Sequence, residues 1–308
     1  MKKITIVGAG RVGESTAFNL ARDELCREVM LIDIKDGIPQ GGALDIQEAA
    51  PELEFDSWLS GSIDLKDMAG SDMVIITAGI PRKQGMSRSD VLDVNLNVIK
   101  GIVDVMKDVV PDALLIVVTN PVDVLTYAAW KQLGWPRNQV MGMAGVLDSA
   151  RMATFISLET GYSVKDISAM VLGGHGDTMV PMPRFTGING ISIDQFISKD
   201  RMDAIIERTR NGGAEIIGLK QNSSAYEAPA AAIGTMVAAI AHDQKRIVPA
   251  VAVLDGEYGQ SDICMGVPIV LGSNGMEKVI ELDLNEEEAA AFAHSAEAVK
   301  KDIARLQF

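Results

Sequence analysis

The amino-acid sequence predicts an α/β fold in which a doubly wound parallel sheet is followed by a second part of α+β type. Short apolar runs alternate with helical patterns up to about residue 145. Strands that are apolar throughout and alternate with helices are typical of a parallel sheet covered on both faces. The first strand runs directly into a glycine-rich turn and a helix, and beyond residue 145 the alternation gives way to a mixed pattern.

In the first half, apolar runs predict the strands, and apolar residues at helical spacing predict the helices. The expected strands are 3–7, 28–34, 72–77, 114–119 and 139–143, and the expected helices are 14–21, 40–50, 90–110 and 124–133. Ligands of parallel sheets bind at the carboxyl ends of the strands. We therefore expect one edge of the sheet to carry Gly8, Asp33, Ala78, Gly79 and Asn120. Residues 1–145 are predicted to form a nucleotide-binding domain.

The second half, 146–308, is predicted to form a further domain. Its expected elements are helices at 146–159, 201–219 and 228–242, a strand at 167–172 and β-structure over 247–282. We expect the last helix to follow Asn285, an N-cap residue, with the acidic run Glu286–Glu288 complementing the helix dipole. No Pro- or Ser-rich linker separates the halves, so we expect them to pack closely.

The turn after the first strand has the spacing G-x-G-x-x-G of a Rossmann-type dinucleotide site, and its residues are Gly8, Ala9, Gly10, Arg11, Val12 and Gly13. Gly8 is expected to make the turn, Gly10 to admit a pyrophosphate, and Gly13 to let the helix pack on the strand. The helix N-terminus then offers free N–H groups to the phosphates. The alternative is a glycine turn with a structural role alone.

An acidic residue strengthens the prediction of a dinucleotide site. Asp33 follows Gly13 by about 20 residues and lies at the end of the second strand, as the pattern requires. Its carboxylate can bind the two ribose hydroxyls and would repel a 2′-phosphate, so the sequence favours NAD over NADP. Lys35, two residues later, leaves NADP open as an alternative.

Composition excludes several classes of partner. The net charge is −14, from 42 acidic and 28 basic residues, which argues against a nucleic-acid partner. No apolar run is long enough to span a bilayer, and the apolar start Ile4–Val7 is too short for a signal peptide. Cys26 and Cys264 belong to no metal or redox spacing, so we expect a cytoplasmic protein without a metal site.

One histidine has an unusual neighbourhood. The chain has three histidines, and His175 alone lies between glycines, in the run Leu172–Asp177. Histidine exchanges a proton near neutral pH, and the glycines around it permit a sharp turn and the close approach of another molecule. The alternative is an ordinary loop histidine. We assign no catalytic role to His242 and His294.

A basic loop follows the third predicted strand. Ile80–Arg88 contains Arg82, Lys83 and Arg88, although the protein as a whole is strongly acidic. A solvated loop is the alternative, but its place at the carboxyl end of a central strand favours a lid that closes over a ligand. Gly85 could serve as its flexible point.

Two further groups offer polar side chains to a ligand. Asp148 and Arg151 lie three residues apart and share a helix face, where a surface ion pair is the alternative to a functional role. Asp148 could orient His175, and Arg151 could bind a substrate carboxylate through two hydrogen bonds. Asn120 ends the fourth strand and precedes a proline, so it is either a turn former or a ligand of a substrate oxygen.

Together these motifs resemble the malate/lactate dehydrogenase family, and most closely its malate dehydrogenases of the lactate-dehydrogenase-like type. The motifs are GAGRVG, TAGIPRKQGMSR, TNPVD, GMAGVLDSAR and LGGHGD, in the order of the family and along the whole chain. The resemblance implies NAD-dependent, reversible oxidation of (S)-malate to oxaloacetate. It also implies that residues 146–308 bind the substrate and carry the catalytic histidine, and that the chain forms homodimers or homotetramers.

The resemblance also implies roles for single residues. His175 would accept and return the proton, with Asp148 as its partner. Arg151 would bind the carboxylate beside the reacting carbon, Arg88 would polarise the carbonyl, and Asn120 would contact the substrate. The nicotinamide side of the cofactor would be lined by Asn95, Val118, Thr119 and Asn120.

Arg82 occupies the specificity position of the family, where lactate dehydrogenases typically carry glutamine. A second substrate carboxylate needs a cation there, whereas the methyl group of pyruvate would leave the arginine unpaired and desolvated. Gln84 departs from the family, which usually has proline there, and this could loosen the lid. The alternatives are a lactate or other 2-hydroxyacid dehydrogenase and, more remotely, a non-catalytic protein that senses NAD.

Overall fold

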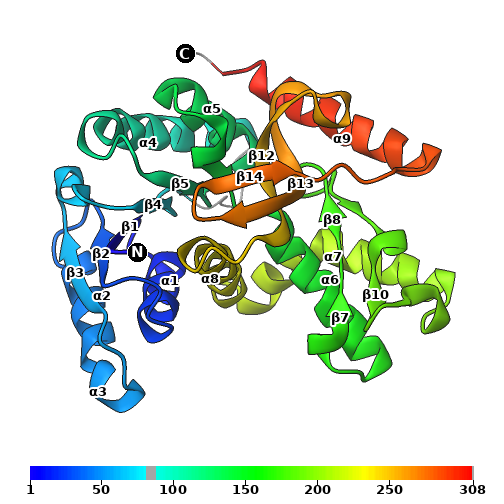
Figure 1. The fold of residues 1–308 in the computed structure, drawn as a ribbon, viewed down its shortest axis with the longest axis horizontal. Coiled ribbons are helices and arrows are strands. Elements are labelled where there is room, and N and C mark those ends of the chain that lie inside the picture. Colours follow the sequence, from blue (N-terminus) through cyan, green and yellow to red (C-terminus); the bar gives the residue numbers. More distant parts are fainter. Residues whose placement is uncertain (81–87, 307–308) are drawn as a thin grey trace.

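The computed structural model describes residues 1–80 and 88–306, with the side chains of all of these except 88–90. Within this part of the chain, nine strands form one sheet in the order β14-β13-β12-β6-β5-β4-β1-β2-β3 (Figure 1). The strands of its first half are β1 Lys3–Val7, β2 Glu28–Ile32, β3 Trp58–Ser62, β4 Met73–Ile76, β5 Leu114–Val117 and β6 Val140–Gly142. These strands pair in parallel. Their order, 3-2-1-4-5-6, is that of a dinucleotide-binding sheet.

Helices cover both faces of the sheet, as the apolar strands predicted. The helices are α1 Arg11–Arg22, α2 Ile38–Glu48, α3 Ala50–Leu53, α4 Arg88–Val109, α5 Val122–Leu133, α6 Gly145–Thr160, α7 Lys199–Lys220, α8 Glu227–Ala241 and α9 Glu286–Ile303. On β4, Met73 and Ile75 pack into the core that contains α1, α2 and α8. Val74 and Ile76 pack into the core of α4 and α5 on the other face. Consecutive side chains of a strand point to opposite faces, so both faces of β4 are buried.

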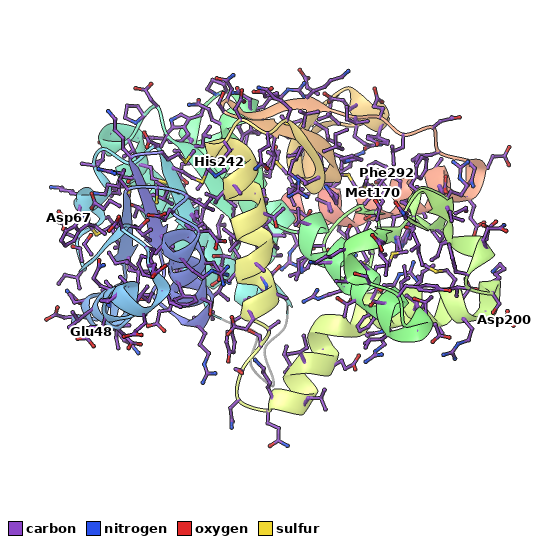
Figure 2. All side chains as sticks on the ribbon, turned by 60° about the horizontal axis from the view of Figure 1, so that its bottom comes forward. Glu48, Asp67, Met170, Asp200, His242 and Phe292 are labelled. Atoms are coloured by element: carbon purple, nitrogen blue, oxygen red, sulfur yellow. The ribbon has the colours of Figure 1, made fainter. Side chains whose placement is uncertain are left out.

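The β-rich end of the chain extends the same sheet. Its strands are β12 Arg246–Asp255, β13 Ser261–Gly272 and β14 Gly275–Val279. β12 lies antiparallel beside β6, where Val251 pairs with Gly142. A Cβ atom on Gly142 would lie 2.5 Å from Oγ1 of Thr126, so a glycine is required at this junction. α8, also from the second half, packs beside α1, and His242 caps its C-terminal end (Figure 2).

Two stretches differ from the expectation. The strand predicted at 167–172 is two short strands, β7 Ile167–Ser168 and β8 Val171–Leu172. β7 forms a three-stranded sheet with β10 Gly187–Ile188 and β11 Ile191–Ser192, whereas β8 pairs with β9 Val180–Pro181. β3 was not predicted, because its sequence Trp-Leu-Ser-Gly-Ser lacks an apolar run; it is an edge strand, and Trp58 is 72% exposed. An edge strand needs fewer apolar residues because one of its sides faces solvent.

The predicted start of the last helix is confirmed. The side chain of Asn285 accepts a hydrogen bond from the backbone N–H of Glu288, and the Glu288 carboxylate accepts one from the N–H of Asn285, at 2.9 Å each. This capping box satisfies two N–H groups that the helix itself leaves unpaired. Across the described ranges, each helix is too short or too polar to traverse a bilayer.

Candidate active site

The glycine-rich turn joins β1 to α1 and has the geometry that its sequence predicts. Gly8 has φ 111°, and a Cβ atom there would lie 2.5 Å from the backbone nitrogen of Ala78. A Cβ atom on Gly13 would lie 1.9 Å from the carbonyl oxygen of Gly8. By contrast, a Cβ atom on Gly10 would meet no atom within 4 Å. Gly8 and Gly13 are thus required by packing, whereas Gly10 faces open space.

The N-terminus of α1 points into that space without a side-chain cap. Gly10 is the N-cap residue and offers no side chain that could accept a hydrogen bond from the first turn. The first N–H groups of a helix have no partner within the helix, and together with the helix dipole they favour an anion. This end of α1 is therefore suited to the phosphates of a dinucleotide.

Asp33 lies beside the same turn, directly after β2. Its Oδ2 atom accepts a hydrogen bond of 2.9 Å from the backbone N–H of Ala9, and its Oδ1 atom accepts one of 3.2 Å from the N–H of Lys35. These bonds hold the carboxylate next to the glycines, where the sequence predicts a partner for ribose hydroxyls. The N–H of Ala9 is thereby directed to Asp33, so the donors left for phosphate lie further along, at the start of α1.

Asn95 and Thr119 tie together the loops that follow β4 and β5. The side-chain amide of Asn95 donates to the carbonyl oxygen of Asn120 at 2.8 Å, and its oxygen accepts the N–H of Ile80 at 2.8 Å. Oγ1 of Thr119 donates to the carbonyl oxygen of Ala78 at 2.7 Å. Asn95 is only 1% exposed, so its contacts in this structure are with the two loops that it holds at the sheet edge.

Asn120 and its neighbours stand where the sequence places them. The Asn120 side chain is exposed at the end of the loop after β5, and the Asn120–Pro121 peptide bond is cis. Val118 donates its backbone N–H to the carbonyl oxygen of Ile76 at 2.9 Å and is largely buried. The predicted edge is thus formed by the turn after β1, Asp33 after β2, and the loops after β4 and β5.

His175 and Asp148 form a close pair. Nδ1 of His175 lies 2.8 Å from Oδ2 of Asp148, which is in the first turn of α6. Asp148 is 2% exposed and the His175 side chain 17% exposed. Within the described part of the chain, Nε2 of His175 has no hydrogen-bond partner, so this nitrogen can face a ligand.

The protonation of His175 depends on this carboxylate. Burial lowers the pKa of His175, but the charge and the hydrogen bond of Asp148 raise it, and the pKa is raised overall above its ordinary value. The charge of Asp123 adds to the increase, and that of Arg151 opposes it. Histidine can both accept and return a proton, and the paired carboxylate favours the protonated form of this ring.

Arg151 contacts the same carboxylate. Its Nη1 atom donates to Oδ1 of Asp148 at 3.1 Å, and its side chain is only 13% exposed. This is therefore a buried pair and not the surface ion pair of the alternative interpretation. The Nε atom of Arg151 is buried and has no hydrogen-bond partner among the described residues. Buried polar groups normally have partners, so this N–H is available to an anion.

The sequence interpretation missed one charged residue of the site, Asp123. Its Oδ2 atom accepts a hydrogen bond of 2.8 Å from the backbone N–H of His175, and it is 5% exposed. Burial raises the pKa of Asp123 from its ordinary 3.8 to about 6. The available signal was a carboxylate within the otherwise apolar start Val122–Leu125, directly after the strand that ends near Asn120.

The glycines around His175 serve the fold more than a ligand. Gly173 and Gly176 have φ 82° and 111°, so the predicted sharp turn is present. However, a Cβ atom on Gly174 would lie 2.7 Å from Cγ2 of Val299, and one on Gly173 would lie 2.8 Å from Oγ of Ser295. The space left by these two glycines is thus filled by α9, which corrects our expectation that it admits a ligand. Ser295 also accepts the N–H of Gly174 at 2.8 Å.

The basic loop cannot be placed in this site. Arg82, Lys83, Gln84 and Gly85 lie outside the described residues, as does the side chain of Arg88, the first residue of α4. The lid and the two arginines predicted in it therefore stay predictions from sequence. The described structure brings together His175, Asp148 and Arg151.

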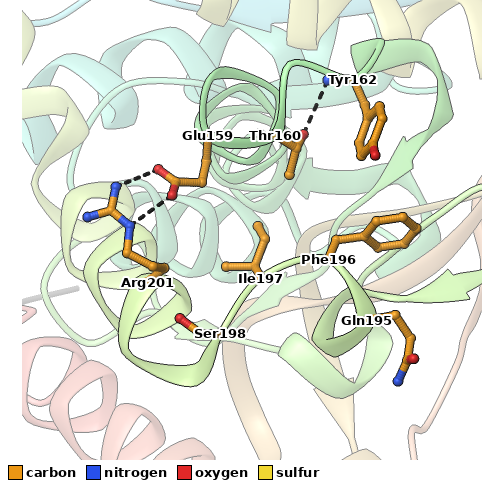
Figure 3. A pocket seen from close by; sticks show the side chains of 8 residues that line it. All are labelled: Glu159, Thr160, Tyr162, Gln195, Phe196, Ile197, Ser198 and Arg201. Atoms are coloured by element: carbon orange, nitrogen blue, oxygen red, sulfur yellow. Dashed lines mark hydrogen bonds and ion pairs between the residues drawn. The ribbon is translucent and has the colours of Figure 1, made fainter.

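The hollow between the end of α6 and the start of α7 lies apart from these residues (Figure 3). It has a volume of about 390 Å³, and none of the predicted site residues lines it. Arg201 in its wall binds Glu159 through two hydrogen bonds of 2.8 and 2.6 Å. Because these opposite charges neutralise each other, the hollow offers little attraction to an anionic substrate, and we do not take it as the active site.

Known proteins resemble the chain along its whole length. A family model described as "lactate/malate dehydrogenase, NAD binding domain" matches residues 2–142, and one described as "lactate/malate dehydrogenase, alpha/beta C-terminal domain" matches residues 145–307. A curated protein named malate dehydrogenase, from Thioalkalivibrio sulfidiphilus, is 59% identical over 307 residues, which is 100% of either chain.

Solved structures agree with this similarity. The malate dehydrogenase of Salinibacter ruber has a TM-score of 0.94 and 45% identity, covering 98% of this chain and 96% of its own. The lactate dehydrogenase of Cryptosporidium parvum, solved with lactic acid and NAD, has a TM-score of 0.94 and 38% identity, covering 99% of each chain. Since both enzymes share the fold equally well, the backbone alone does not distinguish their substrates.

Proposed function

The chain belongs to the lactate/malate dehydrogenase family, and we propose that it is an NAD-dependent malate dehydrogenase that interconverts (S)-malate and oxaloacetate. Curated relatives at 59% identity carry the name malate dehydrogenase. The observation that carries the chemistry is the buried carboxylate of Asp148, which binds His175 with one oxygen and Arg151 with the other. A proton-transfer group and an anion-binding group are thereby fixed side by side.

The N-terminal part of the chain matches the NAD-binding domain of the family, and the residues present fit this cofactor. The uncapped start of α1 and the open space at Gly10 suit the pyrophosphate. NAD, when bound, accepts the hydride from the alcohol carbon. We assign the cofactor site to Gly8, Ala9, Gly10, Arg11, Val12, Gly13, Asp33, Asn95, Val118, Thr119 and Asn120. Asp33 would bind the ribose hydroxyls.

His175 would move the proton of the reaction. The bond to Asp148 keeps the hydrogen of the neutral ring on Nδ1 and leaves Nε2 as an acceptor. In the oxidation of malate, Nε2 takes the hydroxyl proton, and Asp148 stabilises the resulting cation. In the reduction of oxaloacetate, the protonated ring returns it. Asp148 orients the ring in both directions.

Charged side chains would hold the two substrate carboxylates. Arg151 would bind the carboxylate beside the reacting carbon, and its buried Nε–H supports this role because it has no acceptor among the described residues. We assign the second carboxylate to Arg82 and polarisation of the carbonyl to Arg88, on the evidence of sequence. Asn120, whose side chain is exposed at the same edge, would contact the substrate.

We further propose a role for each domain, a cellular location and an oligomeric state. Residues 1–145 would form the NAD-binding domain and residues 146–308 the substrate-binding and catalytic domain, the latter sharing the central sheet through β12–β14. The protein would be a cytoplasmic homodimer or homotetramer without a nucleic-acid or membrane partner. The net charge of −14 supports the exclusion of nucleic acid.

The decisive test compares two substrates. Oxidation of NADH is followed with oxaloacetate and with pyruvate under identical conditions. We expect kcat/KM for oxaloacetate to exceed that for pyruvate by about 100-fold or more, since a site built for a charged group leaves that group unpaired in the wrong complex. A preference for pyruvate would favour lactate dehydrogenase instead, and tight NADH binding without turnover would favour an NAD sensor.

A further inference from the structure

A second carboxylate contacts the catalytic histidine, at its backbone N–H and not at its ring. Asp123 lies in the first turn of α5 and binds the backbone N–H of His175 at 2.8 Å through Oδ2. Its Oδ1 atom is buried and has no hydrogen-bond partner within residues 1–80 and 88–306. A buried carboxylate with an unsatisfied oxygen costs folding free energy, so its presence here calls for a functional explanation.

We propose that Asp123 is a positioning residue for the reaction: its hydrogen bond fixes the main chain of His175, and its charge favours the protonated imidazole. This inference rests on the proposed function, in which His175 carries the proton. The two carboxylates then divide the task, because Asp148 orients the ring through Nδ1 while Asp123 holds the backbone from which the ring extends.

The titratable groups around Asp123 come from several elements. Asp148 comes from α6, His175 from the loop after β8, and Cys264 from β13. Burial, and then the charge of Asp123, raises the pKa of the Cys264 thiol well above its ordinary value, so Cys264 stays neutral. Arg151 is bonded to Asp148 and offsets part of the negative charge there. Asp123 has no such hydrogen-bonded cation among the described residues.

The charge of Asp123 is itself dependent on pH. Burial raises the pKa of Asp123 to about 6, so the carboxylate is ionised above this pH and gains a proton below it. When Asp123 is ionised it raises the pKa of His175, and this effect fades as the pH falls. The two groups therefore titrate as a coupled pair, with Asp148 as a further neighbour.

Two substitutions separate the hydrogen bond from the charge. Asp123→Asn keeps an oxygen that can accept the N–H of His175 but removes the charge. Asp123→Ala removes both. Asp112→Asn is the matched control, because Asp112 is an exposed carboxylate in the turn between α4 and β5.

The readout is the titration of His175 by NMR of ¹³C-histidine-labelled protein. The chain has three histidines, so the Cε1 resonance of His175 is identified by its loss in His175→Gln, and His242 and His294 are internal references. We expect Asp123→Asn to shift the His175 titration to lower pH by at least about half a unit, with His242 and His294 unchanged. We expect no shift in Asp112→Asn. A His175 titration that superimposes on that of the parent protein would overturn the inference.

Kinetics complete the test. In Asp123→Asn, the acid limb of the malate oxidation profile should move to lower pH with kcat at the plateau within about threefold of the parent, whereas Asp123→Ala should lower the plateau kcat by about tenfold or more. Equal plateau rates in the two variants would contradict the role of the hydrogen bond. The parent enzyme's turnover of oxaloacetate tests the proposed function separately, because the NMR titration needs no turnover.

The parent protein also tests the inference if Asp123→Asn does not fold. Its own His175 titration should be broader than that of one independent group, because Asp123 changes its charge around pH 6 and the two groups are coupled. A curve that fits one independent proton-binding site would contradict the coupling.

Discussion

Oδ2 of Asp148 lies 2.8 Å from Nδ1 of His175, and the Asp148 side chain is almost completely buried. The residues come from distant parts of the chain, the start of α6 and the loop after β8. Their contact engages Nδ1 of His175 and not Nε2, and Arg151 lies beside them on the other oxygen of Asp148. The chemistry assigned to this protein depends on this arrangement.

Removal of the Asp148 charge should impair the chemical step. In Asp148→Asn the amide cannot stabilise the protonated ring, so we expect kcat to fall by about 100-fold to 10,000-fold. The unfolding midpoint and the NADH affinity are measured alongside, with Asp166→Asn, an exposed carboxylate, as control. A kcat within tenfold of the parent in a folded Asp148→Asn protein would refute this role.

Gly10 should be needed for the cofactor and not for the fold. A Cβ atom on Gly10 meets no protein atom within 4 Å, yet it would stand where the pyrophosphate approaches. We expect Gly10→Ala to weaken NADH binding by about tenfold or more, measured by fluorescence titration, with little change in thermal stability. Gly41→Ala is the control, since Gly41 on α2 is equally open. Equal NADH affinity in the two variants would show that the turn is not the phosphate site.

Asp123 should make stability depend on pH. Its pKa is about 6 in the folded chain against an ordinary 3.8, so the folded state binds the proton more tightly. Its contribution to the free energy of unfolding is therefore fully present below pH about 4 and lost as the pH rises through about 6. In urea unfolding, the free energy of unfolding of Asp123→Asn relative to that of the parent should rise between pH 4 and pH 8, by on the order of 1 to 3 kcal/mol. A gain independent of pH would contradict the raised pKa.

Much of the fold and site could be predicted because local patterns determine them. Gly8, Gly13 and Asp33 follow from a spacing tied to one supersecondary unit, and the apolar strands β4 and β5 follow from burial on both faces. β3 was missed because an edge strand needs no apolar run. Its pairing is determined by contacts distant in sequence.

The role of Asp123 could not be read from its neighbours in sequence. Its hydrogen bond to His175 spans 52 positions and exists only once α5 and the loop after β8 pack together. The same holds for Gly173 and Gly174, whose lack of side chains is explained by Ser295 and Val299 of α9. Sequence patterns describe what a segment can do alone, whereas these residues are determined by tertiary packing.

The most direct measurement is the ratio of kcat/KM for oxaloacetate to that for pyruvate, in the parent protein and in Arg82→Gln. Lys83→Gln, which removes a charge from the same basic loop, is the control. We predict that the parent and the control prefer oxaloacetate by about 100-fold or more, and that Arg82→Gln loses this preference or reverses it toward pyruvate. If Arg82→Gln turned over oxaloacetate with undiminished efficiency and preference, the account of a site built around a second carboxylate would be wrong.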